Sequence, residues 1–172
     1  MRDLSGKVAL ITGAASGIGR GLVDAAVAAG MVVVAADVDA DGLAEVDVAL
    51  TQRGIRHAVS TLDIRDRASW AELLERTERE LGPVQLLCNN AGAIPGGSIF
   101  DLSMEKWVES WQLKVFGYIH MTQLALEQMK ARKTMAPLVT GNRKPRPVAS
   151  NNRPGLERRK CSRVSSCGGR RA

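Results

Sequence analysis

Hydrophobic positions in this chain fall into short unbroken runs, separated by longer stretches in which apolar residues recur every three or four positions. Unbroken runs are typical of strands that are covered on both faces, and the wider spacing is typical of amphipathic helices. The runs predict strands at residues 7–11, 31–36, 55–62 and 84–88. The spaced stretches predict helices at residues 18–29, 40–52, 69–81 and 103–130.

Glycine and proline mark the ends of the predicted helices. Gly30 and Gly54 follow the first and second helices, and Gly82-Pro83 follows the third. Glycine just past the last periodic residue is a common helix stop, because it adopts the left-handed conformation without a steric penalty. Strand and helix therefore alternate four times with short connections. This order predicts an α/β fold with a right-handed parallel sheet.

Polar and glycine-rich stretches follow directly after the predicted strands. They are residues 12–19 after the first strand, Asp37 after the second, Asp63 after the third and residues 89–92 after the fourth. In parallel α/β sheets, ligands bind beyond the carboxyl ends of the strands. The sequence therefore predicts a single ligand site assembled from these stretches.

The first of these stretches contains Gly13, Gly17 and Gly19 between a strand and a helix. Glycines let the backbone curl tightly and approach a ligand closely, and the first amides of the following helix have no partner within it. Such a turn can bind a pyrophosphate. The spacing Gly-x-x-x-Gly-x-Gly differs from the common dinucleotide pattern Gly-x-Gly-x-x-Gly, so by itself it is also compatible with a simple linking turn.

Two aspartates are candidate nucleoside ligands. Asp37 ends the second strand, 18 residues after Gly19, where a carboxylate can accept both hydrogen bonds of an adenosine ribose diol and repels a 2′-phosphate. It therefore favours NAD over NADP, with a solvated turn acid as the alternative. Asp63 can accept from an adenine amino group, and its alternative role is the N-cap of the third helix, for which Asp66 and Ser69 compete.

The predicted helix of residues 103–130 is apolar almost all the way round, and its candidate N-caps are Asp101 and Ser103. A helix of this kind is buried on more than one side, so we expect it to pack against the sheet and to pair with a second subunit. Lys114 interrupts the apolar stripe that holds Trp111. A lysine in such a position usually extends its amine to the nearest water.

Charge divides the chain of 172 residues into two parts. Residues 1–130 hold 12 basic and 17 acidic side chains, a net charge of −5, whereas residues 131–172 hold 12 basic side chains and one acidic, a net charge of +11. The first part has the composition of a globular domain. The second is a basic, low-complexity tail with almost no apolar periodicity, and we expect it to be disordered.

Composition disfavours several other classes of protein. The three cysteines, Cys88, Cys161 and Cys167, have no metal-ligand spacing, so we expect neither a disulfide nor a metal site. Cys88 lies in an apolar run and is expected to be a small core residue. No apolar stretch reaches 18 residues and the N-terminus has no signal-peptide pattern, which predicts a cytoplasmic protein without a membrane span.

Taken together, residues 12–19, Asp37, Asp63 and residues 89–92 resemble the short-chain dehydrogenase/reductase family, over residues 5 to about 130. The resemblance implies a Rossmann-type doubly wound parallel sheet in three α/β/α layers. It also implies an oxidoreductase that moves a hydride between NAD(H) and an alcohol or carbonyl substrate. By this resemblance the pyrophosphate would lie on Gly13, Ser16, Gly17, Ile18 and Gly19, the adenosine ribose on Asp37, the adenine on Asp63 and Ile64, and the nicotinamide-side ribose on Asn90, Ala91 and Gly92.

The chain departs from the family pattern in its catalytic residues. The family uses an Asn on the long helix, a Ser after the fifth strand, and a Tyr followed four residues later by a Lys that lowers the tyrosine pKa. Here Lys114 occupies the position of the Asn, and the one tyrosine, Tyr118, is followed four residues later by Thr122. We therefore assign no catalytic residue and expect hydride transfer to be absent or severely impaired. A non-catalytic nucleotide-binding subunit is the alternative.

The sequence after Lys130 also differs from the family. Only residues 136–140 resemble a fifth strand, so we expect the sheet to end after the fourth strand and the long helix. Three accounts of the basic tail stay open: an out-of-frame translation, a nucleic-acid or membrane-surface arm, and an inert disordered extension. The first is favoured, because the composition changes where a family member would enter its catalytic core. A nucleic-acid binder is the least favoured function, because no aromatic residue interleaves the basic side chains of the tail.

Overall fold

The structure of the protein, a computed structural model, describes residues 3–93, 96, 98–132 and 138–140. These residues all belong to one compact unit, Met1–Asn142. The basic residues from 143 onward, and with them the predicted disorder of the tail, lie outside the described residues.

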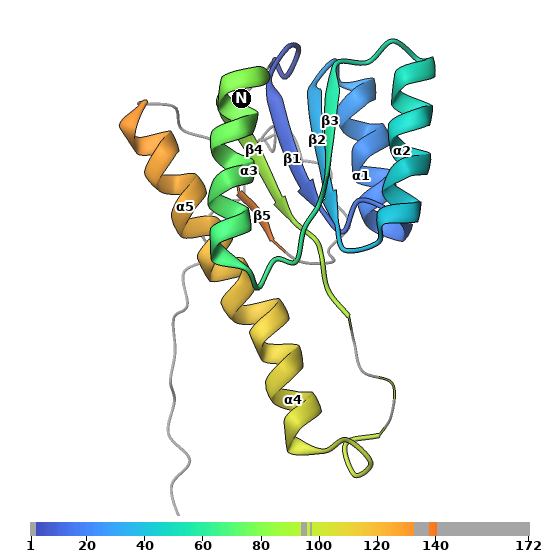
Figure 1. The fold of residues 1–172 in the computed structure, drawn as a ribbon, viewed down its shortest axis with the longest axis vertical. Helices are drawn as coiled ribbons and strands as arrows, with labels where there is room; N and C mark the ends of the chain where they lie inside the picture. The colour runs from blue at the N-terminus through green and yellow to red at the C-terminus, as the bar shows by residue number, and fades with distance from the viewer. Residues whose placement is uncertain (1–2, 94–95, 97, 133–137, 141–172) are drawn as a thin grey trace, which may run out of the picture. The chain divides into compact units, whose positions relative to one another are not determined.

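A parallel sheet forms the centre of this unit (Figure 1). Its strands are β1 (Val8–Thr12), β2 (Val32–Asp37), β3 (His57–Thr61), β4 (Val84–Asn89) and β5 (Leu138–Thr140). They lie in the order β3-β2-β1-β4-β5, with every neighbouring pair parallel. Because the chain moves from β1 outward to β3 and then back across to β4, the carboxyl ends of β1 and β4 flank the point where the strand order reverses.

Helices cover both faces of the sheet. They are α1 (Gly17–Ala28), α2 (Ala40–Gln52), α3 (Arg67–Glu80), α4 (Met104–Trp111), the π-helix η1 (Gln112–Gly117) and α5 (Tyr118–Ala131). In Figure 1, α1 and α2 lie on one face and α3 and α5 on the other. The Rossmann-type doubly wound sheet in three layers, predicted from the sequence, is therefore confirmed.

Alternating side chains along each strand feed two separate cores. Val8 and Leu10 of β1 pack with Trp70 of α3 and Met121 of α5, among others. The intervening strand residues pack on the opposite face, where the core includes Ala9, Ile11, Val33, Ala35, Leu43, Val46, Leu50 and Cys88. Since side chains point to alternate faces of a strand, a run without polar residues is what a sheet covered on both faces requires.

Cys88 is a core residue, as its place in an apolar run predicts. It is 4% exposed, and burial raises the pKa of its thiol to about 11. Its sulfur is therefore protonated at neutral pH and behaves as a small apolar group.

The prediction that the sheet ends after its fourth strand is wrong. β5 adds a fifth strand, with Leu138 paired to Leu87 and Thr140 paired to Asn89. The outer edge of β4 would otherwise present a row of unpaired backbone groups, and Leu-Val-Thr is a segment of residues suited to a strand. The expected domain end at residue 130 falls short of this strand, whereas the compact unit runs to Asn142.

The long helix predicted at residues 103–130 is present with an interruption that its pattern does not reveal. Ser103 caps α4 as expected, accepting a hydrogen bond from the amide of Lys106. Residues 112–117 then form a π-helical turn before α5 begins. Gly117 is buried here, and a Cβ on it would come within 3.1 Å of the Ile64 side chain, so glycine lets the helix approach the loop after β3 closely.

Candidate functional site

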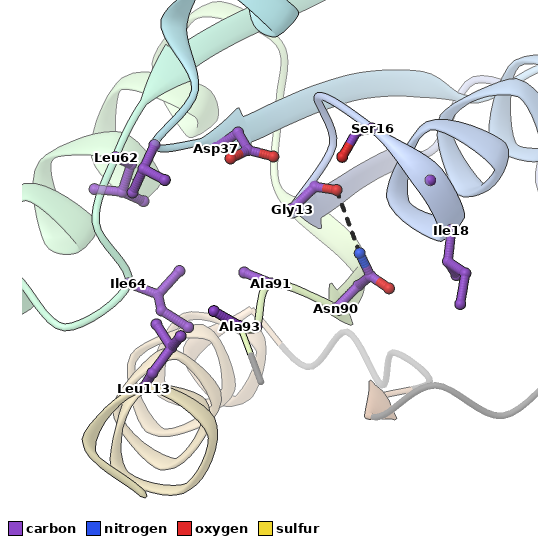
Figure 2. A pocket seen from close by; sticks show the side chains of 13 residues that line it. Gly13, Ser16, Ile18, Asp37, Leu62, Ile64, Asn90, Ala91, Ala93 and Leu113 are labelled. Carbon is purple, nitrogen blue, oxygen red and sulfur yellow. Dashed lines mark hydrogen bonds between the residues drawn. The ribbon is translucent and has the colours of Figure 1, made fainter. Parts of the chain in front are cut away.

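A cavity of about 320 Å³ opens at the carboxyl edge of the sheet (Figure 2). Its walls come from the turn after β1, the ends of β2 and β3, the segment after β4, and η1. The residues that line it are Gly13, Ser16, Gly17, Ile18, Asp37, Val38, Leu62, Ile64, Asn90, Ala91, Gly92, Ala93 and Leu113. This volume and its mixture of apolar walls with a few polar groups suit a small-molecule site.

Most of the predicted site residues line this cavity. Gly19 and Asp63 are the two that do not. The sequence reasoning missed Val38, Leu62, Ala93 and Leu113. Val38 and Leu62 lie next to or at the end of a predicted strand, and Ala93 follows the predicted stretch of residues 89–92. Including the residues that adjoin each predicted stretch could therefore have found all three. Leu113 lies much later in the chain, on a helix that is apolar almost all the way round. The residue pattern of that helix does not indicate which side faces the cavity.

The turn after β1 uses its three glycines in different ways. Gly13 has a φ of +67°, and a Cβ on it would come within 2.8 Å of the Ala91 Cα. Gly19 is placed so that a Cβ would overlap the Gly13 carbonyl oxygen, at 1.7 Å. Gly17 has a φ of +53° and open space beside its Cα. Gly13 and Gly19 thus permit close packing of the turn, while Gly17 faces the cavity.

The N-terminus of α1 is left uncapped at the cavity wall. Its N-cap, Ser16, makes no side-chain hydrogen bond to the helix, and its first turn contains no acidic residue. By contrast, Asp39 and Asp66 cap α2 and α3 with their carboxylates. The first amides of a helix have no intrahelical partner and lie at the positive end of its dipole, so the α1 terminus can bind an anion.

Among the described residues that line the cavity, Asp37 is the one with an ionisable side chain. One carboxylate oxygen accepts a hydrogen bond from the amide of Ala15 at 2.9 Å, and the other accepts from the amide of Asp39 at 3.1 Å. These bonds fix the carboxylate beside the β1 turn. Each oxygen keeps a further lone pair, so the group can still accept from a ligand diol.

Asp63 does not line the cavity, and its carboxylate is paired with Arg65. The Arg65 Nε atom lies 2.9 Å from one oxygen and 3.0 Å from the other, and the Arg65 amide also donates to the group. The hydrogen bond from the Arg65 side chain lowers the pKa of the Asp63 carboxyl. Asp63 does not cap α3 either, since Asp66 accepts the amide hydrogen bonds of Ala68 and Ser69 there.

Thr12 joins the β1 turn to the segment that follows β4. It is fully buried, and its hydroxyl accepts the amides of Asn90 at 3.0 Å and Ala91 at 3.1 Å while donating to the Cys88 carbonyl at 3.3 Å. The Asn90 side-chain amide donates back to the carbonyls of Thr12 and Gly13, the latter bond drawn in Figure 2. This network fixes two walls of the cavity relative to each other.

Tyr118 is occupied by a structural hydrogen bond. Its half-buried hydroxyl donates to the Ala91 carbonyl oxygen at 2.7 Å, and burial raises the pKa of the phenol. Thr122, four residues later, accepts a hydrogen bond from the side chain of Asn89 at 3.0 Å. These two α5 side chains therefore hold the end of β4 and the segment that follows it in place.

Within the described ranges, no group of three or more His, Cys, Asp or Glu residues could hold a metal ion. In the same part of the chain, no helix has the length and apolar character needed to cross a bilayer.

The sequence of this chain is similar to those of known dehydrogenases. The family described as "short chain dehydrogenase" matches residues 7–139. The chain is 32% identical over 142 residues to 2,3-dihydro-2,3-dihydroxybenzoate dehydrogenase of Bacillus subtilis (strain 168), covering 82% of this chain and 54% of that protein. It is 34% identical over 127 residues to 7alpha-hydroxysteroid dehydrogenase of Escherichia coli (strain K12), covering 74% of this chain and 49% of that protein.

A solved structure gives the same relationship. The short chain dehydrogenase/reductase from Burkholderia phymatum, in complex with NAD, superimposes with a TM-score of 0.77 at 32% identity, covering 81% of this chain and 50% of that one. This chain thus spans about half the length of the curated relatives that it matches.

The Thr12 network can be tested by removing the hydroxyl while keeping the side-chain shape. Thr12→Val leaves the amides of Asn90 and Ala91 without their acceptor, so we expect the free energy of unfolding to fall by about 1–3 kcal/mol. Thr12→Ser keeps the hydroxyl and should lose less. Urea unfolding of the three proteins measures this, and a Val variant at least as stable as the Ser variant would contradict the role of the network.

Proposed function

We propose, on the ground that this chain belongs to the short-chain dehydrogenase family, that it binds NAD or NADH across the carboxyl edge of its sheet. The observation that carries the proposal is that an uncapped helix N-terminus and a fixed carboxylate line the same cavity, on adjacent strands β1 and β2. A dinucleotide presents an anionic pyrophosphate next to a ribose diol, the two groups that these features can bind.

The residues of the β1 turn fit the pyrophosphate. Ser16, Gly17 and Ile18 line the cavity at the N-terminus of α1, and Gly13 provides the close approach of the turn. Gly19 acts indirectly in this proposal, because it allows the helix to pack on the Gly13 carbonyl.

The remaining walls fit the two nucleoside halves. Asp37 would accept the hydroxyls of the adenosine ribose, and Ile64, with Leu62 and Leu113, offers an apolar surface for the adenine. Residues 90–92 would contact the nicotinamide-side ribose. Asp63 takes part in this assignment only if the cofactor displaces Arg65 from its carboxylate.

The bound cofactor supplies the hydride donor or acceptor in this family, and the substrate by resemblance is a small alcohol or carbonyl compound. The residues of this chain bind and orient the cofactor, but its sequence contains no Tyr-x-x-x-Lys pair, and the Tyr118 hydroxyl donates a hydrogen bond to the Ala91 carbonyl oxygen. General acid–base catalysis typically contributes about 10²–10⁴-fold. We therefore propose that the chain holds NAD(H) and transfers hydride poorly, which favours a nucleotide-binding role for it.

Cofactor preference follows from Asp37. We expect NADH to bind about tenfold or more tightly than NADPH, because the carboxylate accepts the ribose hydroxyls and repels a 2′-phosphate. Asp37→Asn should remove most of this preference. Asp41→Asn, on the exposed first turn of α2 outside the cavity, is the matched control and should leave it unchanged. Fluorescence titrations with both cofactors give the ratio, and equal affinities in the unaltered protein would refute the assignment.

Hydride transfer is tested by NADH oxidation with a broad panel of ketones and aldehydes. We expect turnover near background although NADH binds. Gly17→Val is the control for site-specific turnover, since a β-branched residue is strained at a φ of +53° and should abolish binding. Robust reduction that Gly17→Val abolishes would show a competent enzyme, whereas binding without turnover supports the nucleotide-binding alternative.

We also propose that the chain pairs with a second copy through its long helix. Met104, Val108 and Trp111 of α4 are 51–71% exposed, and Ile99, Leu102, Trp107 and Phe116 complete a second cavity of about 700 Å³ on this apolar surface. Apolar patches of this kind commonly mark interaction surfaces. The cytoplasmic location and the non-involvement of nucleic acid stay predictions from the sequence.

The pairing can be tested by making the same substitution, Val to Glu, at one position inside the apolar surface and at one outside it. Val108 on α4 is 51% exposed, and Val48 on α2 is 55% exposed. Val108→Glu should raise the dimer dissociation constant about tenfold or more, because it places a charge in the apolar contact, whereas Val48→Glu should not. Sedimentation analysis measures both, and a monomeric unaltered protein at tens of micromolar would disprove the pairing.

A further inference from the structure

Lys114 lies against Gly92, in the wall of the cavity that follows β4. A Cβ on Gly92 would come within 2.5 Å of the Lys114 Cε atom and 3.4 Å of its Nζ atom, so the lysine side chain extends along the Gly92 backbone. Gly92 lines the cavity, as does Leu113, the residue before Lys114 on η1 (Figure 2). The amine therefore lies close to the β4 side of the site.

This lysine has no carboxylate to neutralise it within the described part of the chain. Its half-buried side chain makes no hydrogen bond or ion pair there. Arg65, which follows β3, is by contrast paired with Asp63. An unpaired cation that is shielded from water on one side acts on charges in the adjacent cavity more strongly than an exposed one does.

The strand order fixes which part of a dinucleotide Lys114 would face. Asp37 ends β2, the glycine turn follows β1, and Gly92 follows β4, and these three strands are neighbours in that order. Strands lie about 4.8 Å apart, so the β2 and β4 ends are separated by about 10 Å. With the adenosine ribose at Asp37 and the pyrophosphate at the central turn, the nicotinamide half lies at β4, beside Lys114.

We infer that Lys114 makes this site select the reduced form of the cofactor. The nicotinamide ring of NAD⁺ carries a positive charge, and the ring of NADH is neutral. The two forms share the same pyrophosphate and riboses, so attraction between Lys114 and those groups contributes equally to both. Repulsion between the ammonium and the charged ring is confined to NAD⁺. This inference rests on the proposed dinucleotide function, which it extends.

The experiment is a calorimetric titration of the full chain with NAD⁺, NADH and ADP-ribose, the last of which lacks the ring. Lys114→Met removes the charge at similar length and should lower the ratio of the NAD⁺ and NADH dissociation constants about tenfold. Lys114→Arg should preserve the ratio. Lys106→Met, the same substitution at an exposed position on α4, is the matched control and should preserve it as well.

Each outcome bears on a different claim. If Lys114 has only a structural role, Lys114→Met would weaken the binding of all three ligands by the same factor and leave the ratio of the NAD⁺ and NADH dissociation constants unchanged. That result would overturn the inference, whereas binding of NADH and ADP-ribose would still support the dinucleotide site. The ratio should also shrink with added salt in the unaltered protein and not in Lys114→Met, because salt screens the repulsion. Failure of all three ligands to bind the unaltered protein would overturn both claims.

Discussion

The hydrogen bonds around the Thr12 hydroxyl hold together the two strand ends on which this site depends. β1 and β4 are far apart in sequence but adjacent in the sheet, where Ile11 pairs with Cys88, and a hydrogen-bonded link through Thr12 continues this pairing beyond the strand ends. Thr12 and Asn90 supply that link in both directions, each bonding to the backbone of the other segment. Gly13 then packs directly on Ala91, at a distance that leaves no room for a side chain. Two walls of the cavity are the segments that this junction fixes, and the other walls come from the ends of β2 and β3 and from η1.

Charged groups follow a fixed order along the carboxyl edge of the sheet, which is set by the order of the strands. The positive end of α1 lies in the middle, after β1, with the Asp37 carboxylate on the β2 side and the Lys114 ammonium on the β4 side. The central group and the group on the β4 side attract anions, whereas the group on the β2 side is a carboxylate that repels them. A ligand with a central anion and two different ends therefore meets three distinct environments in a fixed order, which gives it a single orientation.

Much of the site can be predicted from the sequence, because it consists of residues that directly follow the strands. The apolar runs predict β1, β2 and β4, and the groups that follow them, such as Asp37 and Asn90, are carried to one edge by the parallel order. What the sequence does not reveal depends on side-chain conformation, on the local course of a helix, or on pairing between distant strands. The pairing of Arg65 with Asp63 depends on side-chain rotamers, the position of Leu113 depends on a π-helical turn, and β5 depends on the free edge of β4. In each case the competing local arrangement is equally compatible with the residue pattern.

The burial of Cys88 has a consequence for the way this domain opens. Its thiol lies in the core one residue before the Asn89–Asn90 pair, and its carbonyl receives the Thr12 hydroxyl. A sulfur that stays protonated and covered reacts with an alkylating reagent only when β4 separates from the helices above it. Its rate of alkylation therefore reports how often β4 separates from the helices packed on it. A ligand that binds across the carboxyl edge of the sheet would lower that rate without touching the cysteine.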